Sequence, residues 1–111
     1  MQTIAFEEFQ NMQIHTGTVI SASLNEKARI PAWVLDIDFG TELGVKTTSA
    51  QLTELYASGD LVDTQVVAVT NFPPLRVAGV KSEVLVLGIL DSKGVVLLRP
   101  DRQVENGTRV A

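Results

Sequence analysis

The chain has 111 residues and a formal net charge of −4, from 9 basic and 13 acidic side chains. This length suits one hydrophobic core, and the content of 45% hydrophobic and 20% charged residues favours folding over disorder. The lack of cysteine excludes disulfides, thiolate metal sites and a cysteine nucleophile, and a single histidine excludes a multi-histidine metal centre within one chain. The acidic balance excludes a strongly basic nucleic-acid binder but is compatible with a local basic patch.

Three further expectations follow from the composition and the first residues. No apolar run reaches the roughly 18 residues of a membrane helix, so we expect no membrane insertion. The first nine residues carry Glu7 and Glu8 and no basic residue, which argues against a signal or transit peptide and for a cytoplasmic location. No cofactor or metal site is expected.

Apolar side chains at Phe6, Phe9 and Met12 have the three-residue spacing of a helix face. They predict a short N-terminal helix, with Thr3 ahead of it as a candidate N-cap. The apolar stripe of one isolated helix must cover either the rest of the domain or another chain, and we assign these three residues to a dimer interface.

Alternating apolar residues predict most of the remaining elements. A long strand is expected over 14–24, with Gly17 permitting a bend or bulge, and a second strand over 32–39, where Trp33, Leu35, Ile37 and Phe39 share a face. The other expected elements are a turn at 40–44, a third strand at 45–48, a helix at 50–56 capped by Thr48 or Ser49, a stop at 58–60, a fourth strand at 65–72, a loop at 75–82, a fifth strand at 83–89 and a sixth at 95–98.

The number of strands and the helix between the third and fourth predict a small closed barrel. We interpret residues 1–111 as one mainly β domain, a five-stranded OB-fold Greek-key barrel. A short N-terminal helix precedes the barrel, and a C-terminal extension with an Asn106–Gly107 turn follows it. In this fold, ligands bind the exposed face of the second and third strands and the loops beside it.

Several strings in fixed order carry a family resemblance. They are IDFGTE (37–42), TSAQ (48–51), VTNFPP (69–74), AGVKSEVLVLG (78–88), VLLRPD (96–101) and NGT (106–108). Together, over 6–110, they resemble the CsaA export-related chaperones and the free-standing tRNA-binding proteins, whose domain is also appended to some methionyl-tRNA synthetases.

The resemblance implies a homodimer assembled through the N-terminal helix and the C-terminal segments. It also implies a binding activity rather than catalysis. CsaA-like members are linked to secretion through unfolded or signal-bearing polypeptides and the SecA motor. Their relatives recognise the folded shape of tRNA.

The candidate binding residues lie around the proline-containing bend and the third strand. They are Lys46, Ser49, Asn71, Arg76, Lys81 and Ser82. The last four present donors that suit a phosphate or a peptide carbonyl. The alternative for the bend is that its prolines merely end a strand. Lys46 and Ser49 lie near the predicted beginning of the helix at 50–56. Either the helix N-terminus binds an anion there, or Thr48 or Ser49 simply caps the helix.

Three other features have a functional and a structural interpretation. Trp33 either stacks on a base or packs in the core. Asp36 and Asp38 share a strand face, but nothing supplies a third ligand or a nucleophile, so no enzyme activity is expected. His15 is expected at the surface.

Two function hypotheses remain open. The first is a CsaA-like homodimeric chaperone for unfolded or export-competent polypeptides. The second is a structure-specific tRNA-binding protein, in which Lys27 and Arg29 join the basic residues above. Leu75 and His15 stand where the tRNA-binding relatives often carry basic residues, and they favour the first hypothesis.

Overall fold

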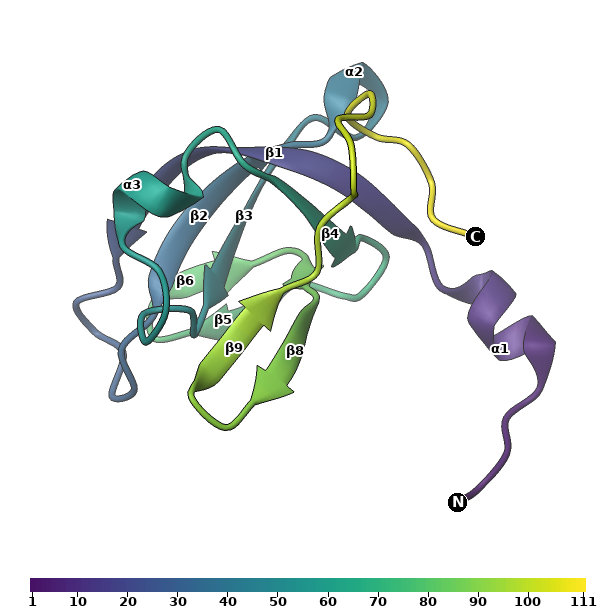
Figure 1. The fold of residues 1–111 in the computed structure, drawn as a ribbon, viewed down its shortest axis with the longest axis horizontal. Helices are drawn as coiled ribbons and strands as arrows, with labels where there is room; N and C mark the ends of the chain where they lie inside the picture. Colours follow the sequence, from purple (N-terminus) through teal and green to yellow (C-terminus); the bar gives the residue numbers. More distant parts are fainter.

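Short strands dominate the computed structural model, which describes residues 1–111 (Figure 1). The helices are α1 (Phe6–Asn11), α2 (Gly40–Leu43) and α3 (Ser58–Leu61). The strands are β1 (Ile14–Leu24), β2 (Trp33–Asp38), β3 (Val45–Ala50), β4 (Gln65–Val69), β5 (Leu75–Val77), β6 (Val80–Ser82), β7 (Leu85–Val86), β8 (Gly88–Asp91) and β9 (Gly94–Leu97). No helix is long and apolar enough to cross a membrane.

Five strands form one antiparallel sheet in the order β3-β2-β1-β4-β7. The sheet curls until its two edges meet. At this seam the Glu83 N–H donates to the Thr47 carbonyl over 2.8 Å, and the Thr48 hydroxyl donates to the Val84 carbonyl over 2.7 Å. The result is a nearly closed barrel, so the predicted OB-fold type of architecture is confirmed. The hairpins β5–β6 and β8–β9 extend from it (Figure 1).

The barrel core is built from branched aliphatics and one phenylalanine. Leu35 and Ile37 of β2, and Phe39 directly after it, alternate inward, as predicted, and are at most 1% exposed. Gly17 faces Ile37 and Phe39 so closely that a Cβ atom there would lie 2.7 Å from each side chain. Gly17 is therefore needed for space, and the bulge expected near it falls instead between Val19 and Ser21.

The C-terminal extension explains why both faces of β1 are covered at its start. Ile14 and Thr16 are buried on one face, yet Val19, which strand alternation places on the opposite face, is fully buried as well. The Thr16 N–H donates to the Thr108 carbonyl (3.0 Å), and the Val110 N–H donates to the Ile14 carbonyl (2.8 Å). The extension thus runs along the edge of β1 that precedes its pairing with β2, and Val110 packs against the small cluster of Ile14, Val67 and Val69.

The prediction of a helix over 50–56 was wrong, because no helix forms there. Strand β3 continues to Ala50, because Ser49 pairs with Val34 and the Thr48 hydroxyl bonds across the barrel seam instead of capping a helix. The single helical turn between β3 and β4 is α3, at the predicted stop, where the Asp60 carboxylate accepts the Ala57 N–H over 2.9 Å. The anion site expected at a helix beginning near Ser49 is therefore not formed.

Four further expectations need correction. Residues 75–82 form the hairpin β5–β6 rather than a loop, and the strand predicted over 83–89 is divided into β7 and the start of β8. The turn at 40–44 contains the one-turn helix α2. Thr3 does not cap α1, whose N-cap is Ala5 with no side-chain hydrogen bond.

Candidate ligand-binding groove and basic cluster

An open groove of about 450 Å³ lies beside the proline-containing bend. We call it the apolar groove. It is lined by Thr48, Ser49, Phe72, Pro73, Pro74, Leu75, Val77, Ser82, Glu83, Val84 and Leu85. Phe72, Leu75 and Leu85 are large apolar side chains that are exposed there, and Leu75 is 67% exposed. This surface offers apolar contact to a ligand.

Ser49 and Ser82, two of the predicted site residues, belong to this groove. The hydroxyls of Thr48 and Ser82 share a 2.7 Å hydrogen bond, and the Ser49 N–H donates to the Ser82 hydroxyl over 3.3 Å. The Ser49 hydroxyl also accepts the Asn25 amide over 3.4 Å. The hydroxyl groups therefore fix the groove wall as well as line it.

Arg76 and Lys81 lie on the opposite face of the hairpin. They pair with each other across β5–β6, while Leu75 pairs with Ser82. Since side chains alternate along a strand, the two basic groups point away from the face that Leu75 and Ser82 present to the groove.

Lys27 joins them from the loop between β1 and β2. Its Cδ lies 3.2 Å from where a Cβ atom of Gly79 would stand, so its stem covers the hairpin turn. The Arg76 guanidinium donates to the Gly79 carbonyl over 3.2 Å at the same turn. Lys27, Arg76 and Lys81 thus form the basic cluster.

Lys46 is placed differently from the basic cluster. Its Nζ lies 3.8 Å from a Glu83 carboxylate oxygen, and both side chains are partly exposed. The other Glu83 carboxylate oxygen accepts the Thr47 N–H over 3.3 Å. Lys46 is therefore partly neutralised at the groove rim, and such an exposed pair stabilises the fold little.

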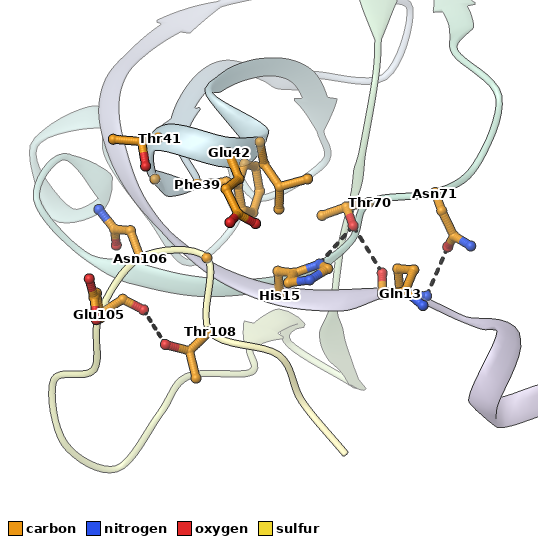
Figure 2. Close-up of a pocket in the computed structure, with 13 residues that line it drawn as sticks. Gln13, His15, Phe39, Thr41, Glu42, Thr70, Asn71, Glu105, Asn106 and Thr108 are labelled. Atoms are coloured by element: carbon orange, nitrogen blue, oxygen red, sulfur yellow. Dashed lines mark hydrogen bonds between the residues drawn. The ribbon is translucent and has the colours of Figure 1, made fainter.

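Asn71, the remaining one of the six predicted site residues, connects helix α1 to the barrel. Its Oδ1 accepts the Gln13 N–H over 2.9 Å, and its Nδ2 donates to the Asn11 carbonyl over 2.8 Å. Its side-chain amide is thus occupied within the chain (Figure 2).

A second, polar cleft of about 720 Å³ surrounds His15 (Figure 2). It is lined by Gln13, His15, Phe39, Gly40, Thr41, Glu42, Leu43, Thr70, Asn71, Glu105, Asn106, Gly107 and Thr108. Three of the strings that carry the family resemblance, 37–42, 69–74 and 106–108, supply most of its lining. The sequence did not predict the cleft itself, because its walls come from four separate segments. The chain contains no group of three or more histidine, aspartate or glutamate side chains arranged to hold a metal ion.

Within this cleft the imidazole of His15 is held in place. Its Nδ1 lies 2.8 Å from the Thr70 hydroxyl, which itself donates to the Gln13 carbonyl over 3.2 Å. Nδ1 therefore donates to Thr70. Burial lowers the pKa of His15 below its ordinary 6.5, and the positive charge of Arg109 lowers it further.

The structural interpretations of Trp33 and the two aspartates are supported. The indole N–H of Trp33 donates to the Tyr56 carbonyl over 3.0 Å, and the ring packs against the core, which opposes a stacking role. Asp36 accepts the hydroxyls of Ser21 and Thr47, at 2.9 and 2.6 Å. The Asp36 carboxylate therefore links β2 to both neighbouring strands. Asp38 accepts the Gly40 N–H over 2.8 Å, so its carboxylate stabilises the turn after β2.

Comparison with known proteins decides the family. Residues 14–109 match the family model described as "Putative tRNA binding domain". The chain belongs to this family. Among solved structures, the CsaA chaperone of Bacillus anthracis strain Ames is 50% identical with a TM-score of 0.93, covering 99% of this chain and 100% of that one. The CsaA chaperone of Picrophilus torridus is 39% identical with a TM-score of 0.94, covering 98% and 100%.

The family also includes part of a much larger enzyme. Methionine–tRNA ligase of Pyrococcus furiosus is 32% identical over 110 residues, which are 99% of this chain and 15% of the ligase. The chain thus spans about 15% of the length of the curated relatives it matches. The resemblance to CsaA chaperones, tRNA-binding domains and the domain of methionyl-tRNA synthetases is confirmed.

Proposed function

We propose that the chain is a CsaA-like chaperone that binds unfolded or export-competent polypeptides and performs no catalysis. The apolar groove carries this proposal, because it exposes large apolar side chains in a chain 50% identical to a CsaA chaperone. Burial of apolar surface is the main driving force for such binding. Pro73 and Pro74 fix the backbone beside Leu75, which reduces the entropy lost when a ligand binds.

The proposal includes a homodimer joined through Phe6, Phe9 and Met12 of the α1 region. Phe6 is 68% exposed, and none of the residues of α1 is buried within the chain. A dimer presents two apolar grooves, so two segments of one unfolded client are held together and the effective affinity rises. The partners we propose are signal-bearing polypeptides and, in secretion, the SecA motor.

Leu75→Asp tests the groove. Delayed aggregation of a chemically unfolded client, measured by light scattering, is expected for the native protein and should be largely lost in this variant. Leu90→Asp is the matched control, because Leu90 is 87% exposed and does not line the groove. The proposal fails if the native protein leaves aggregation unchanged, or if the two variants protect the client equally well.

tRNA binding is a second candidate function, favoured by the family and by the basic cluster of Lys27, Arg76 and Lys81. The cluster lies on the hairpin face opposite the groove, so the two ligands would use separable surfaces. Phosphate contacts release counterions, so tRNA affinity should fall steeply with added salt.

Arg76→Ala tests this second function. The variant should weaken tRNA binding and reduce the slope of log affinity against log salt by about one. Leu75→Asp should leave the slope unchanged. Absence of tRNA binding even at low salt would exclude this function.

A further inference from the structure

The turn of the β5–β6 hairpin fixes which backbone groups face outward. Ala78 and Gly79, its two central residues, have φ values of +47° and +82°. Positive φ at both positions is the pattern of the two-residue hairpin turn whose twist matches the flanking strands. In such a hairpin the flanking pair, here Val77 and Val80, exchanges both N–H···O bonds.

The next pair along the hairpin is Arg76 and Lys81. Hydrogen-bonded and non-hydrogen-bonded pairs alternate along an antiparallel ladder, so Arg76 and Lys81 do not exchange backbone hydrogen bonds. The Arg76 N–H and C=O therefore point to the outer edge of β5. No other strand pairs with β5, since the sheet contains β5 and β6 alone. The preceding Pro73 and Pro74 have no N–H, so Arg76 offers the one complete donor–acceptor set before the turn.

The side chains beside this free edge are sorted by face. Leu75 and Val77 line the apolar groove, whereas Arg76 lies on the other face with Lys81. A strand added at the edge would alternate in the same way. The residue opposite Arg76 would direct its side chain toward the basic pair, and its two neighbours would direct theirs into the groove.

We propose that the polypeptide ligand adds to the free edge of β5 as a short extended strand. One ligand residue exchanges two main-chain hydrogen bonds with Arg76, and the apolar side chains before and after it enter the groove. This binding mode rests on the proposed chaperone function and specifies its substrate class, an extended apolar–X–apolar segment. Acidic or polar X is favoured, because a lysine at X would face Arg76 and Lys81.

The test uses acetylated Ser-Leu-Asp-Leu-Ser amide as the probe and chemical-shift titration of the full chain. Arg76→Pro removes the outward N–H at an edge position that tolerates proline, and Arg76→Ala, the matched control, removes the same side chain but keeps the N–H. A hydrogen bond is worth about 1 kcal/mol, so Arg76→Pro should bind the probe roughly fivefold more weakly than Arg76→Ala.

Chemical changes in the probe provide an arm that does not depend on folding of the variant. N-methylation of the central Asp should weaken binding several-fold, whereas N-methylation of the following Leu, whose N–H points away from β5, should not. Replacing the central Asp by Lys should also weaken binding.

The outcomes separate the two proposals. Unequal effects of the paired changes, with shifts at groove residues, support edge addition. Edge addition is overturned, and the chaperone proposal is kept, if groove residues shift but the two N-methylations have equal effects. The same holds if Arg76→Pro folds and binds the probe as well as Arg76→Ala does. If the probe causes no chemical-shift changes at groove residues, edge addition is overturned. The client aggregation assay then decides the chaperone function by itself.

Discussion

Ala78 has a backbone conformation that suits another residue. Its φ of +47° costs an L-residue about 1 kcal/mol or more, and the following Gly79 completes a turn for which Asn-Gly is the preferred pair. Ala78→Asn should therefore raise the free energy of unfolding in urea by about 0.5–1 kcal/mol. Ala78→Val should lower it, because a β-branched residue tolerates this conformation least. Equal stability of the two variants would contradict the left-handed geometry of the turn.

His15 should make stability depend on pH. Its pKa is lowered in the folded chain by burial and by Arg109, so the unfolded chain binds the proton more tightly. Stability from the neutral imidazole is complete above pH 6.5 and is lost as pH falls from 6.5 through the lower folded pKa. We expect the melting temperature to fall more for the native protein than for His15→Gln when the pH is lowered from about 7.5 to about 5.5. These two values lie on either side of the ordinary pKa of histidine.

A direct titration checks the cause. The imidazole resonances of His15 should report a pKa below 6.5 in the folded chain. The other charged groups in the cleft, Glu42 and Glu105, would act in the opposite direction by favouring the protonated ring. A measured pKa at or above 6.5 would show that these carboxylates outweigh burial and Arg109.

At the scale of elements, Asn71 determines how α1 sits on the barrel. Its amide bonds both the Gln13 N–H and the Asn11 carbonyl, and the Arg109 guanidinium bonds the Gln10 carbonyl over 3.0 Å. A helix of six residues has too few internal hydrogen bonds to persist alone. These three contacts therefore hold its C-terminal end.

Asn71→Ala should release α1. Heteronuclear NOE values of residues 6–11 should fall, while the probe peptide should bind the apolar groove as before. Asn71→Asp keeps the acceptor for Gln13 but loses the donor to Asn11, so its effect should be intermediate. Loss of peptide or tRNA binding with an unchanged α1 would instead support the ligand contact predicted for Asn71 from the sequence.

The sequence predicts those elements whose pattern is local. Leu35, Ile37 and Phe39 alternate along β2 and the residue after it because one face packs in the core, and this pattern is visible without the structure. The hairpin at 75–82 is not visible, because Ala-Gly lacks the Asn or Asp that usually marks such a turn. Thr48 and Ser49 resemble helix caps, yet their hydroxyls bond Ser82 and Asn25, which are distant in the sequence.

The same reason limits prediction of the site. Ser49 and Ser82 meet in the groove because the barrel closes at β3, a contact across 33 residues that no periodicity encodes. Arg76 and Lys81 were predicted beside the groove residues, but the strand alternation places them on the other face. The polar cleft depends on contacts between the start of β1 and the C-terminal extension, such as the Thr16 hydroxyl with the Glu105 carbonyl.

At the scale of the molecule, α1 projects from one side of the barrel (Figure 1). Phe6 and Phe9 stack on each other with centroids 6.3 Å apart, and Phe9 also packs against the small cluster of Ile14, Val67 and Val69. The remaining surface of Phe6, with Met12, is exposed. Apolar residues gathered on a projecting helix are typical of an interface between chains.

Phe6→Asp should therefore convert the proposed dimer to a monomer, since a buried unpaired carboxylate at the centre of an apolar interface is strongly unfavourable. Sedimentation should give twice the chain mass of 12.0 kDa for the native protein and the single mass for the variant.

Glu7→Asp, a neighbouring change that keeps the charge, should leave the dimer intact. A native chain that sediments as a monomer, or a Phe6→Asp variant that remains a dimer, would remove α1 from the interface. The monomer should still bind the probe peptide, because the groove lies within one chain, but should protect unfolded clients less, because only the dimer holds two segments at once.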